Sequence, residues 1–304
     1  MAAKRCLIAL AFLIFLGVVP PSPAQGTTIQ VGGGRIDVVF LTDASKQIQA
    51  LALDWVTTAA RAVTKYYGRF PVPRVAVRIR FDDATRIHSG ETFGAPDGGL
   101  ITVSVGRSTT PMNFHSDWLM THEMVHLAFP SVAEEHHWIE EGLATYVEPI
   151  ARVQIGNLKA REVWADLVRD LPQGLPAAGD RGLDFTPTWG RTYWGGALFC
   201  LLADVQIHRR TANKKGLQDA LRGILQAGGT ISSDWPLARA LRAGDDAVGV
   251  PVLEELYARM RNAPAPVDLA QLWQELGVEH RGGSVILHHD APLAAVRQAI
   301  LPER

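Results

Sequence analysis

Two histidines with three residues between them are the part of this sequence most able to do chemistry. They form the ends of the segment His122-Glu123-Met124-Val125-His126. Residues four apart lie on the same face of a helix, so both imidazoles can bind one Zn²⁺ ion. The glutamate between them is then placed to act on a water molecule at the metal. The pattern therefore predicts a zinc hydrolase with Glu123 as its general base.

A third metal ligand is expected from Glu141. Fourteen residues lie between His126 and Glu141, which is room for the end of one helix, a loop and a returning helix. The neighbouring Gly142 has no side chain and should let the two helices approach closely, although glycine costs a helix about 1 kcal/mol. The alternative is that Glu140, Glu141 and Glu148 form only a solvated helix face.

Two helices are needed to carry these ligands. The first is expected to start at a cap supplied by Asn113 or Ser116 and to stop at Pro130, whose ring cannot continue a helix. The second is expected over residues 136–148, with a stop at Pro149.

Polar residues at both ends of the second helix have two interpretations. His136 and His137 are expected to be exposed polar residues rather than metal ligands. Glu148 lies two turns beyond Glu141 on the same face. It either orients a ligand histidine through a hydrogen bond or is a surface glutamate at a helix end.

The segment from His122 to His126, together with residues 138–146, resembles the gluzincins, zinc peptidases with two histidines and one glutamate as ligands. Among these it is similar to the aminopeptidase N and glycyl aminopeptidase families. The resemblance implies that His122, His126 and Glu141 bind one Zn²⁺ per chain and that Glu123 is the general base. It also implies a thermolysin-like zincin fold for the catalytic region. The spacer before Glu141 is shorter here than in aminopeptidase N.

A later segment, residues 192–199, resembles the helix start that carries a catalytic tyrosine in these aminopeptidases. The hydroxyl of that tyrosine stabilises the oxyanion of the tetrahedral intermediate, so the resemblance makes Tyr193 the candidate electrophile. The family's lysine is replaced here by Gly195. The alternative is that Tyr193 is a packing residue at a helix start.

The glutamate that binds the substrate's free amine in aminopeptidase N enzymes lacks a counterpart of the same motif here. Those enzymes carry Gly-x-Met-Glu-Asn on a strand, and this chain has no such segment. The corresponding stretch is predicted to be residues 90–99, where Glu91, before a glycine-rich turn, is a candidate replacement. Aminopeptidase and endopeptidase activity both stay open.

The sequence predicts an α+β fold with two lobes and the metal cleft between them. Residues 25–112 are expected to form a mixed α/β lobe, and residues 113–304 a mainly helical lobe that carries the zinc site. The role of the last third of the chain is left open. In gluzincins an edge strand beside the metal binds the substrate backbone, a role expected here for residues 100–105. The elements expected are strands 36–41, 75–81 and 100–105 and helices 44–67, 193–208, 217–226, 236–243, 251–261, 269–276 and 292–300.

The N-terminus predicts a cleavable secretory signal peptide over residues 1–24. Two basic residues precede the apolar run 6–19, and small residues lead to a cleavage site after Ala24. The run is short for a membrane span, so an uncleaved anchor is the minor alternative. We expect a periplasmic or extracellular protein without a stable membrane anchor. Cleavage would leave Cys200 as the single cysteine, which excludes an intramolecular disulfide.

The balance of charges argues against nucleic acid as a partner. The chain has 30 basic and 31 acidic residues, so it has no basic field to attract nucleic acid or anionic lipid. A peptide or protein substrate is the expected partner. The competing function is a non-catalytic zinc protein that binds peptides or assists envelope assembly. Glu123 favours the enzyme, because a metal scaffold needs no base between its ligands.

Overall fold

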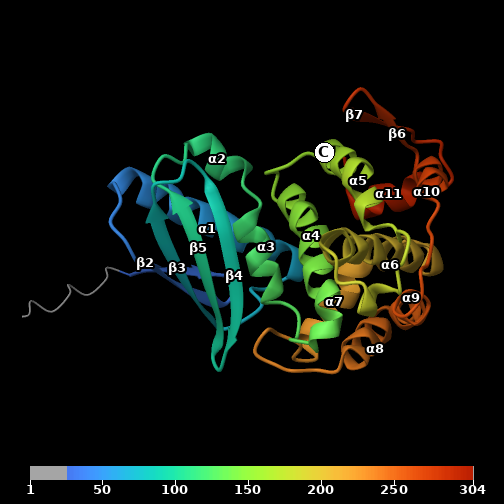
Figure 1. Cartoon of the computed structure of the whole chain (residues 1–304), viewed down its shortest axis with the longest axis horizontal. Helices are drawn as coiled ribbons and strands as arrows, with labels where there is room; N and C mark the ends of the chain where they lie inside the picture. The colour runs from blue at the N-terminus through green and yellow to red at the C-terminus, as the bar shows by residue number, and fades with distance from the viewer. Residues whose placement is uncertain (1–25, 304) are drawn as a thin grey trace, which may run out of the picture.

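The computed structural model describes residues 26–303. Figure 1 shows a sheet on one side of the molecule and most of the helices on the other. The predicted signal peptide, residues 1–24, lies outside the described residues. Within residues 26–303, no helix is both long enough and apolar enough to span a membrane.

Five strands form one mixed sheet in the order β1-β2-β3-β5-β4. Strands β2, β3 and β5 run parallel, whereas β1 and β4 are antiparallel to their neighbours and form the two edges. The strands predicted at 36–41, 75–81 and 100–105 are confirmed as parts of β2, β3 and β5. The bounds are β1 (Thr27–Val31), β2 (Gly34–Phe40), β3 (Arg74–Asp82), β4 (Ile87–Ala95) and β5 (Gly98–Gly106).

The edge of the sheet differs from the prediction. Residues 100–105 do not form the edge strand, because β5 lies between β3 and β4. The turn predicted after Glu91 is present at residues 96–97, and the rest of residues 90–99 belongs to β4 and the start of β5. Most side chains of β4 are exposed, so the strand lacks the apolar alternation by which a half-buried strand is predicted.

Helix α1 (Lys46–Tyr67) packs against β1 and against the helices that carry the predicted ligands. Ser45 caps its start by accepting a hydrogen bond from the backbone N–H of Ile48. The helix ends at Gly68, whose φ of 81° is left-handed. Each large apolar side chain buried on its inner face contributes about 1.5–3 kcal/mol. The helix predicted over 44–67 is confirmed.

The first predicted ligand helix is two helices, α2 (Pro111–Ser116) and α3 (Leu119–His126). Thr110 is the N-cap of α2, and the predicted Asn113 takes part in the cap by accepting a hydrogen bond from the backbone N–H of Thr110. Asp117 adopts an extended backbone between the helices, and its Oδ1 accepts a hydrogen bond from the first backbone N–H of α3. Because α3 ends four residues before Pro130, the proline does not terminate it.

Helix α4 (His137–Gln154) runs through Pro149, where the sequence predicts a stop. A proline inside a helix removes one backbone hydrogen bond and costs about 3 kcal/mol. The turn after it is buried, with Ile150, Ala151 and Val153 all at most 5% exposed. Burial of these apolar side chains offsets the missing hydrogen bond and carries the helix onward.

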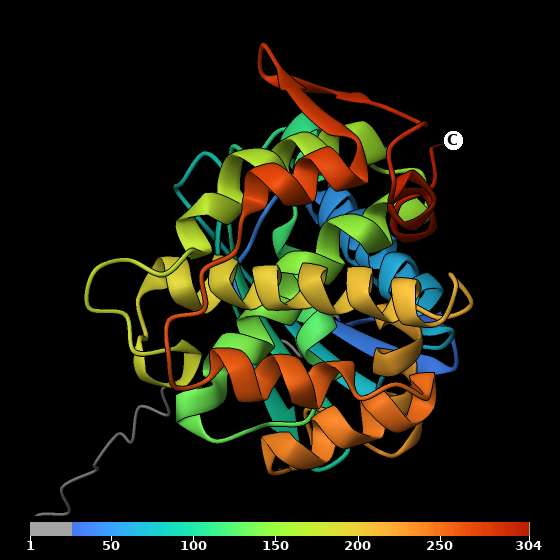
Figure 2. The same cartoon turned by 90° about the vertical axis from the view of Figure 1, so that its right-hand side faces the viewer.

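The rest of the described chain is mainly helical. Helix α6, yellow in Figure 2, crosses the middle of this group and is buried along most of its length. The predicted helices after residue 216 are confirmed, whereas α5 and the hairpin of β6 and β7 carry no prediction. The bounds are α5 (Ala160–Asp170), α6 (Gly196–Arg210), α7 (Leu217–Gln226), α8 (Leu237–Val248), α9 (Val252–Met260), α10 (Leu269–Leu276), β6 (Val278–Arg281), β7 (Ser284–Leu287) and α11 (Ala294–Ile300).

Helices α4 and α6 touch at a pair of glycines. A Cβ at Gly142 would lie 2.3 Å from the Cα of Gly196, closer than any real side chain can come. The close approach predicted at Gly142 therefore exists, but its partner is α6, and the prediction that it joins the two ligand helices is wrong. The π-helical turn η4 (Arg191–Gly195) precedes α6, replaces the first turn of the helix predicted at 193–208, and packs on α4.

Candidate metal centre

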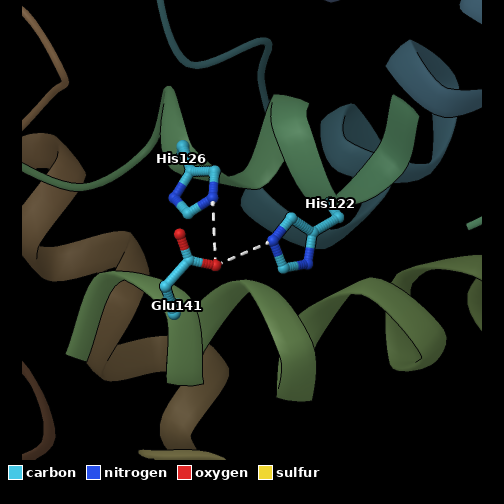
Figure 3. Close-up of side chains that lie close together, drawn as sticks. All are labelled: His122, His126 and Glu141. Carbon is cyan, nitrogen blue, oxygen red and sulfur yellow. Dashed lines mark hydrogen bonds and ion pairs between the residues drawn. The ribbon is translucent and has the colours of Figure 1, made fainter. Parts of the chain in front are cut away.

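Helices α3 and α4 bring the three predicted metal ligands together. Figure 3 shows His122, His126 and Glu141 pointing toward one another across the two helices. Glu141 Oε2 lies 3.1 Å from His122 Nε2 and 3.8 Å from His126 Nε2. One ligand atom from each residue lies within 4.8 Å of the others, as a shared metal ion requires.

The spacing of these atoms fits a zinc ion. Bonds of about 2.1 Å in a tetrahedral site place neighbouring ligand atoms about 3.4 Å apart. The two distances to Glu141 lie on either side of that value. Two imidazoles and one carboxylate are a donor set typical of catalytic zinc, in which three protein ligands leave one position for water or substrate.

The pKa values of His126 and Glu141 also suit a metal. Burial and the neighbouring His122 lower the pKa of His126 to about 3, so its imidazole is neutral and has a free lone pair. Burial alone would raise the pKa of Glu141, but the hydrogen bond with His122 and the nearby histidines lower it overall. A neutral imidazole and an ionised carboxylate are the forms that bind metal ions.

The predicted base, Glu123, lies against strand β4. Its Oε2 accepts a hydrogen bond from Thr92 Oγ1 at 2.6 Å. On the same strand a Cβ at Gly90 would lie 2.9 Å from Cγ and Oε1 of Glu123, so only glycine leaves room for the carboxylate. Burial raises the pKa of Glu123, and the hydrogen bond from Thr92 partly opposes the shift. Neither β4 residue is recognisable as part of a site from sequence.

Tyr193 reaches the same place from the turn η4. Its ring stacks on His122, with ring centroids 6.4 Å apart and planes inclined by 21°. Burial raises the pKa of Tyr193 to about 12, and the charges of Glu141 and Glu123 add to the shift. The hydroxyl therefore keeps its proton at neutral pH and can donate a hydrogen bond.

These residues line one cavity of about 550 Å³. Helices α3 and α4 supply the three predicted ligands and Glu123, η4 supplies Tyr193, and β4 supplies residues 88–93. Glu91, the candidate amine-binding residue, is therefore among the lining residues. It lies on β4, before the turn at residues 96–97.

His137, predicted as an exposed polar residue, contacts the predicted ligand Glu141. Its ring is about half exposed, with Nδ1 3.1 Å from Glu140 Oε2 and Nε2 3.4 Å from Glu141 Oε1. The hydrogen bond to Glu140 raises the pKa of His137. His136 is partly buried, and its Nδ1 lies 3.1 Å from Asp184 Oδ1.

Glu148 is buried, which corrects the alternative of a surface glutamate. Its Oε1 accepts a hydrogen bond from Arg152 Nη1 at 2.8 Å. Arg152 also donates to the backbone carbonyls of His115 and Ser116, at the end of α2. Burial raises the pKa of Glu148 to about 7, although the Arg152 charge opposes the shift. The pair joins α4 to the segment that leads into α3.

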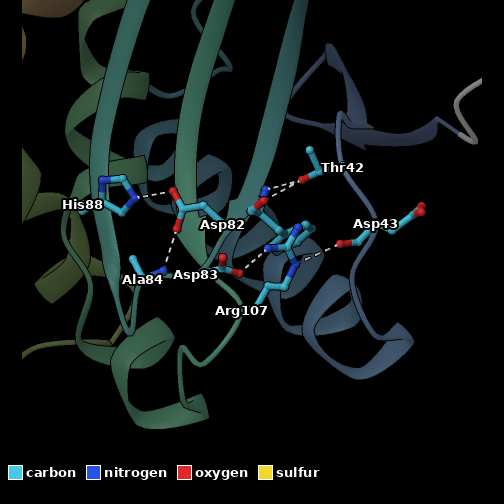
Figure 4. A network of polar contacts seen from close by, with 8 residues as sticks. Thr42, Asp43, Asp82, Asp83, Ala84, His88 and Arg107 are labelled. Atoms are coloured by element: carbon cyan, nitrogen blue, oxygen red, sulfur yellow. Dashed lines mark hydrogen bonds and ion pairs between the residues drawn. The ribbon is translucent and has the colours of Figure 1, made fainter.

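A surface network fixes the start of β4 (Figure 4). His88 Nε2 lies 2.8 Å from Asp82 Oδ2, across the turn between β3 and β4. In the same turn Asp83 pairs with Arg107 at 2.8 Å, and Arg107 also donates to the backbone carbonyl of Asp43. These contacts tie the turn to the segments that follow β5 and β2, and so hold the first residues of the strand that lines the cavity.

Comparison with known proteins places the fold. No family model matches the sequence, and no curated protein sequence is similar to it. Solved structures do match. An aminopeptidase N family protein from Idiomarina loihiensis is 14% identical, with a TM-score of 0.63 over 83% of this chain and 49% of that protein.

A second match is an M1 zinc metallopeptidase from Deinococcus radiodurans, solved with a Tyr-Ser-Ala substrate. It is 15% identical, with a TM-score of 0.51 over 81% of this chain and 54% of that protein. This chain spans about half the length of both proteins. Over that length it has the fold of the M1 zinc metallopeptidases, as the resemblance of its histidine motif to aminopeptidase N predicts.

Proposed function

We propose that this protein is a zinc-dependent peptidase. The observation that carries the proposal is the position of Glu123, a buried carboxylate in the same cavity as the three ligand side chains but outside their cluster. A general base for the attacking water requires that arrangement. The alternative, a zinc protein that only binds peptides, gives no reason for a base held in place by Thr92 and Gly90.

In the proposed mechanism His122, His126 and Glu141 would hold one zinc ion. Zinc bound there would act as a Lewis acid and would make water acidic enough to lose a proton near neutral pH. Glu123 accepts that proton as the water attacks the peptide carbonyl, and it returns the proton to the leaving amine.

Tyr193 is assigned to the carbonyl oxygen of the substrate. As the tetrahedral intermediate forms, that oxygen gains negative charge, and the protonated phenol donates a hydrogen bond to it. The stacking of Tyr193 on His122 supports this role, since it brings the phenol to the metal side of the cavity.

We further propose that the substrate cleft lies between the lobe of residues 25–112 and the helical lobe of residues 113–304. The free edge of β4 is available to pair with the backbone of an extended peptide or protein substrate. The signal peptide proposed over residues 1–24 would direct the mature enzyme to the periplasm or the exterior of the cell.

The test is cleavage of a mixed peptide library by the purified protein, together with its zinc content. We expect about one zinc per chain, and cleavage that a chelator abolishes and added zinc restores. Zinc binding without cleavage of any peptide would support the binding-protein alternative. Cleavage that survives complete removal of the metal would contradict the mechanism.

A further inference from the structure

Two exposed tryptophans stand at the ends of a row of rings that passes through the candidate metal centre. Trp118, at the start of α3, contacts the ring of His122 edge-on at 5.2 Å. His122 stacks on Tyr193, and Tyr193 stacks on Trp189 at 5.7 Å with planes inclined by 29°. The row thus runs from one tryptophan, past a metal ligand and the oxyanion donor, to the other tryptophan.

Both tryptophans are far more exposed than their size favours. Trp118 is 50% exposed and Trp189 is 61% exposed, whereas most large apolar side chains of the described residues are buried. Trp118 also lines the cavity itself. Exposed aromatic surface gains free energy when an apolar group covers it, and a tryptophan offers a large, rigid face at little cost in side-chain entropy.

The position of these rings beside the proposed reaction site indicates which part of a substrate would cover the two tryptophans. In the proposed mechanism the scissile carbonyl lies beside His122 and Tyr193, in the middle of the row. Side chains of an extended substrate project to either side of that point, toward Trp118 in one direction and Trp189 in the other. The cavity lining also includes the acidic residues Glu91 and Glu140, which disfavour acidic substrate side chains.

We propose that Trp118 and Trp189 are specificity residues that select large apolar or aromatic side chains on both sides of the scissile bond. This inference rests on the proposed peptidase function and deepens it. Stacking of a substrate ring on an exposed indole adds binding free energy to that gained by removing apolar surface from water. Discrimination by an apolar subsite of this kind is roughly 10- to 100-fold.

The experiment compares two peptides that differ only at the residues flanking the cleaved bond, phenylalanine in one and alanine in the other. We expect wild-type kcat/KM to be at least roughly tenfold higher for the phenylalanine peptide. In Trp118→Ala and in Trp189→Ala, kcat/KM for the phenylalanine peptide should fall roughly tenfold more than kcat/KM for the alanine peptide. Trp118→Phe and Trp189→Phe should regain most of the preference. Trp189 lies outside the cavity lining but stacks on Tyr193, whereas Phe185, which is 49% exposed, has no described contact with the row of rings, so Phe185→Ala should leave the preference unchanged.

A second measurement separates selection from support of the metal site. Zinc content and the quenching of tryptophan fluorescence by the phenylalanine peptide are measured in each variant. Equal losses on both peptides together with lost zinc would mean that the tryptophans only pack the site, and would overturn the inference. Cleavage of both peptides at equal rates by the wild type would overturn it while leaving the peptidase function intact. Failure to cleave either peptide, or any member of the library, would instead contradict the proposed function.

Discussion

The carboxylate of Glu123, a residue of α3, is held in place by two residues of strand β4. Thr92 donates a hydrogen bond to one of its oxygens, and the missing side chain of Gly90 makes room for the other. If Glu123 is the base, as proposed, a carboxylate fixed in this way is already aligned with the attacking water before substrate arrives.

Glu123→Gln tests this residue most directly. Glutamine keeps the shape and the hydrogen bond with Thr92 but has no site for the proton, so peptide turnover should fall roughly 100-fold or more while zinc stays bound. The measurement is kcat/KM together with metal content. Glu135→Gln, at an exposed glutamate outside the cavity, is the matched control and should behave as wild type. Undiminished hydrolysis by Glu123→Gln would remove its role as base.

Tyr193→Phe asks whether the hydroxyl or only the ring matters. If the hydroxyl binds the oxyanion, which exists only along the reaction path, kcat should fall about 100-fold with KM and zinc content nearly unchanged. A packing residue would keep its stacking on His122 and Trp189 and cost little activity. Full activity in this variant would leave the oxyanion donor unassigned.

Among the elements, the break between α2 and α3 decides where the first ligand lies. Asp117 accepts hydrogen bonds from Trp55 Nε1 at 3.1 Å and from the first N–H of α3 at 2.9 Å. It therefore links the start of the ligand helix to α1, on the far side from the cavity. Burial raises the pKa of Asp117 to about 6.

This pKa makes stability depend on pH in a predictable direction. The folded protein binds the Asp117 proton more tightly than the unfolded chain, whose pKa is near 3.8. Its contribution to stability is therefore full below pH 4 and is lost as the pH rises from about 4 to 6, by about 3 kcal/mol at most. Asp117→Asn keeps the acceptor oxygen and cannot ionise.

We expect the melting temperature of Asp117→Asn, relative to wild type, to be several degrees higher at pH 7 than at pH 4. The comparison between the two proteins cancels the other titrating groups. Asp54→Asn changes an exposed aspartate on α1 and should give the same difference from wild type at both pH values. An equal difference at both pH values for Asp117→Asn would show that this carboxyl does not titrate in the predicted range.

The sequence predicts elements where the signal is local and fails where tertiary contacts decide. The histidine motif is local, and helix spacing alone predicts that both rings share a face. Strand β4 is exposed on most of its length because its neighbours are a cavity and a single strand, so its polar sequence reads as a turn. Pro149 lies inside α4 because burial of the next turn compensates for the lost hydrogen bond. Neither the cavity beside β4 nor the burial of the turn after Pro149 can be recognised from a short stretch of sequence.

Tyr193 shows the same limit at longer range. More than fifty residues separate it from Glu141, and no periodicity links them. Only its resemblance to the aminopeptidase tyrosine marks it as a candidate, and the packing of η4 on α4 is what brings it beside His122. The small residues that support the site, Gly90 and Thr92, carry no motif at all.

At the scale of the whole molecule, zinc should link the part of the chain that forms the sheet to the helical part. The ligands come from α3, which packs on α1 and β4, and from α4, which packs on α6. Because the metal binds the folded chain, it stabilises by about 4 kcal/mol when free zinc exceeds the dissociation constant 1000-fold.

Removal of zinc should therefore lower the melting temperature by roughly 10 °C. His122→Ala should show the same lower value with or without added zinc, because the remaining ligands bind the ion weakly. His280→Ala, at an exposed histidine on β6, should respond to zinc as wild type does. Calorimetry with and without chelator makes the comparison, and identical melting curves for wild-type protein would exclude coupling of the metal to folding.

Gly142 and Gly196 let α4 and α6 approach more closely than two residues with side chains would allow. Gly142 is next to Glu141, and Gly196 follows Tyr193 by three residues, so the contact between them sets the separation of the candidate metal ligand from the proposed oxyanion donor. An alanine at either position would push α4 and α6 apart and move the Tyr193 phenol away from the candidate metal site. The residues proposed to take part in the reaction would all be unchanged. The distance between these two groups therefore depends on two residues that have no side chain, and a substitution at either one would impair the proposed peptidase while the histidine motif stays intact.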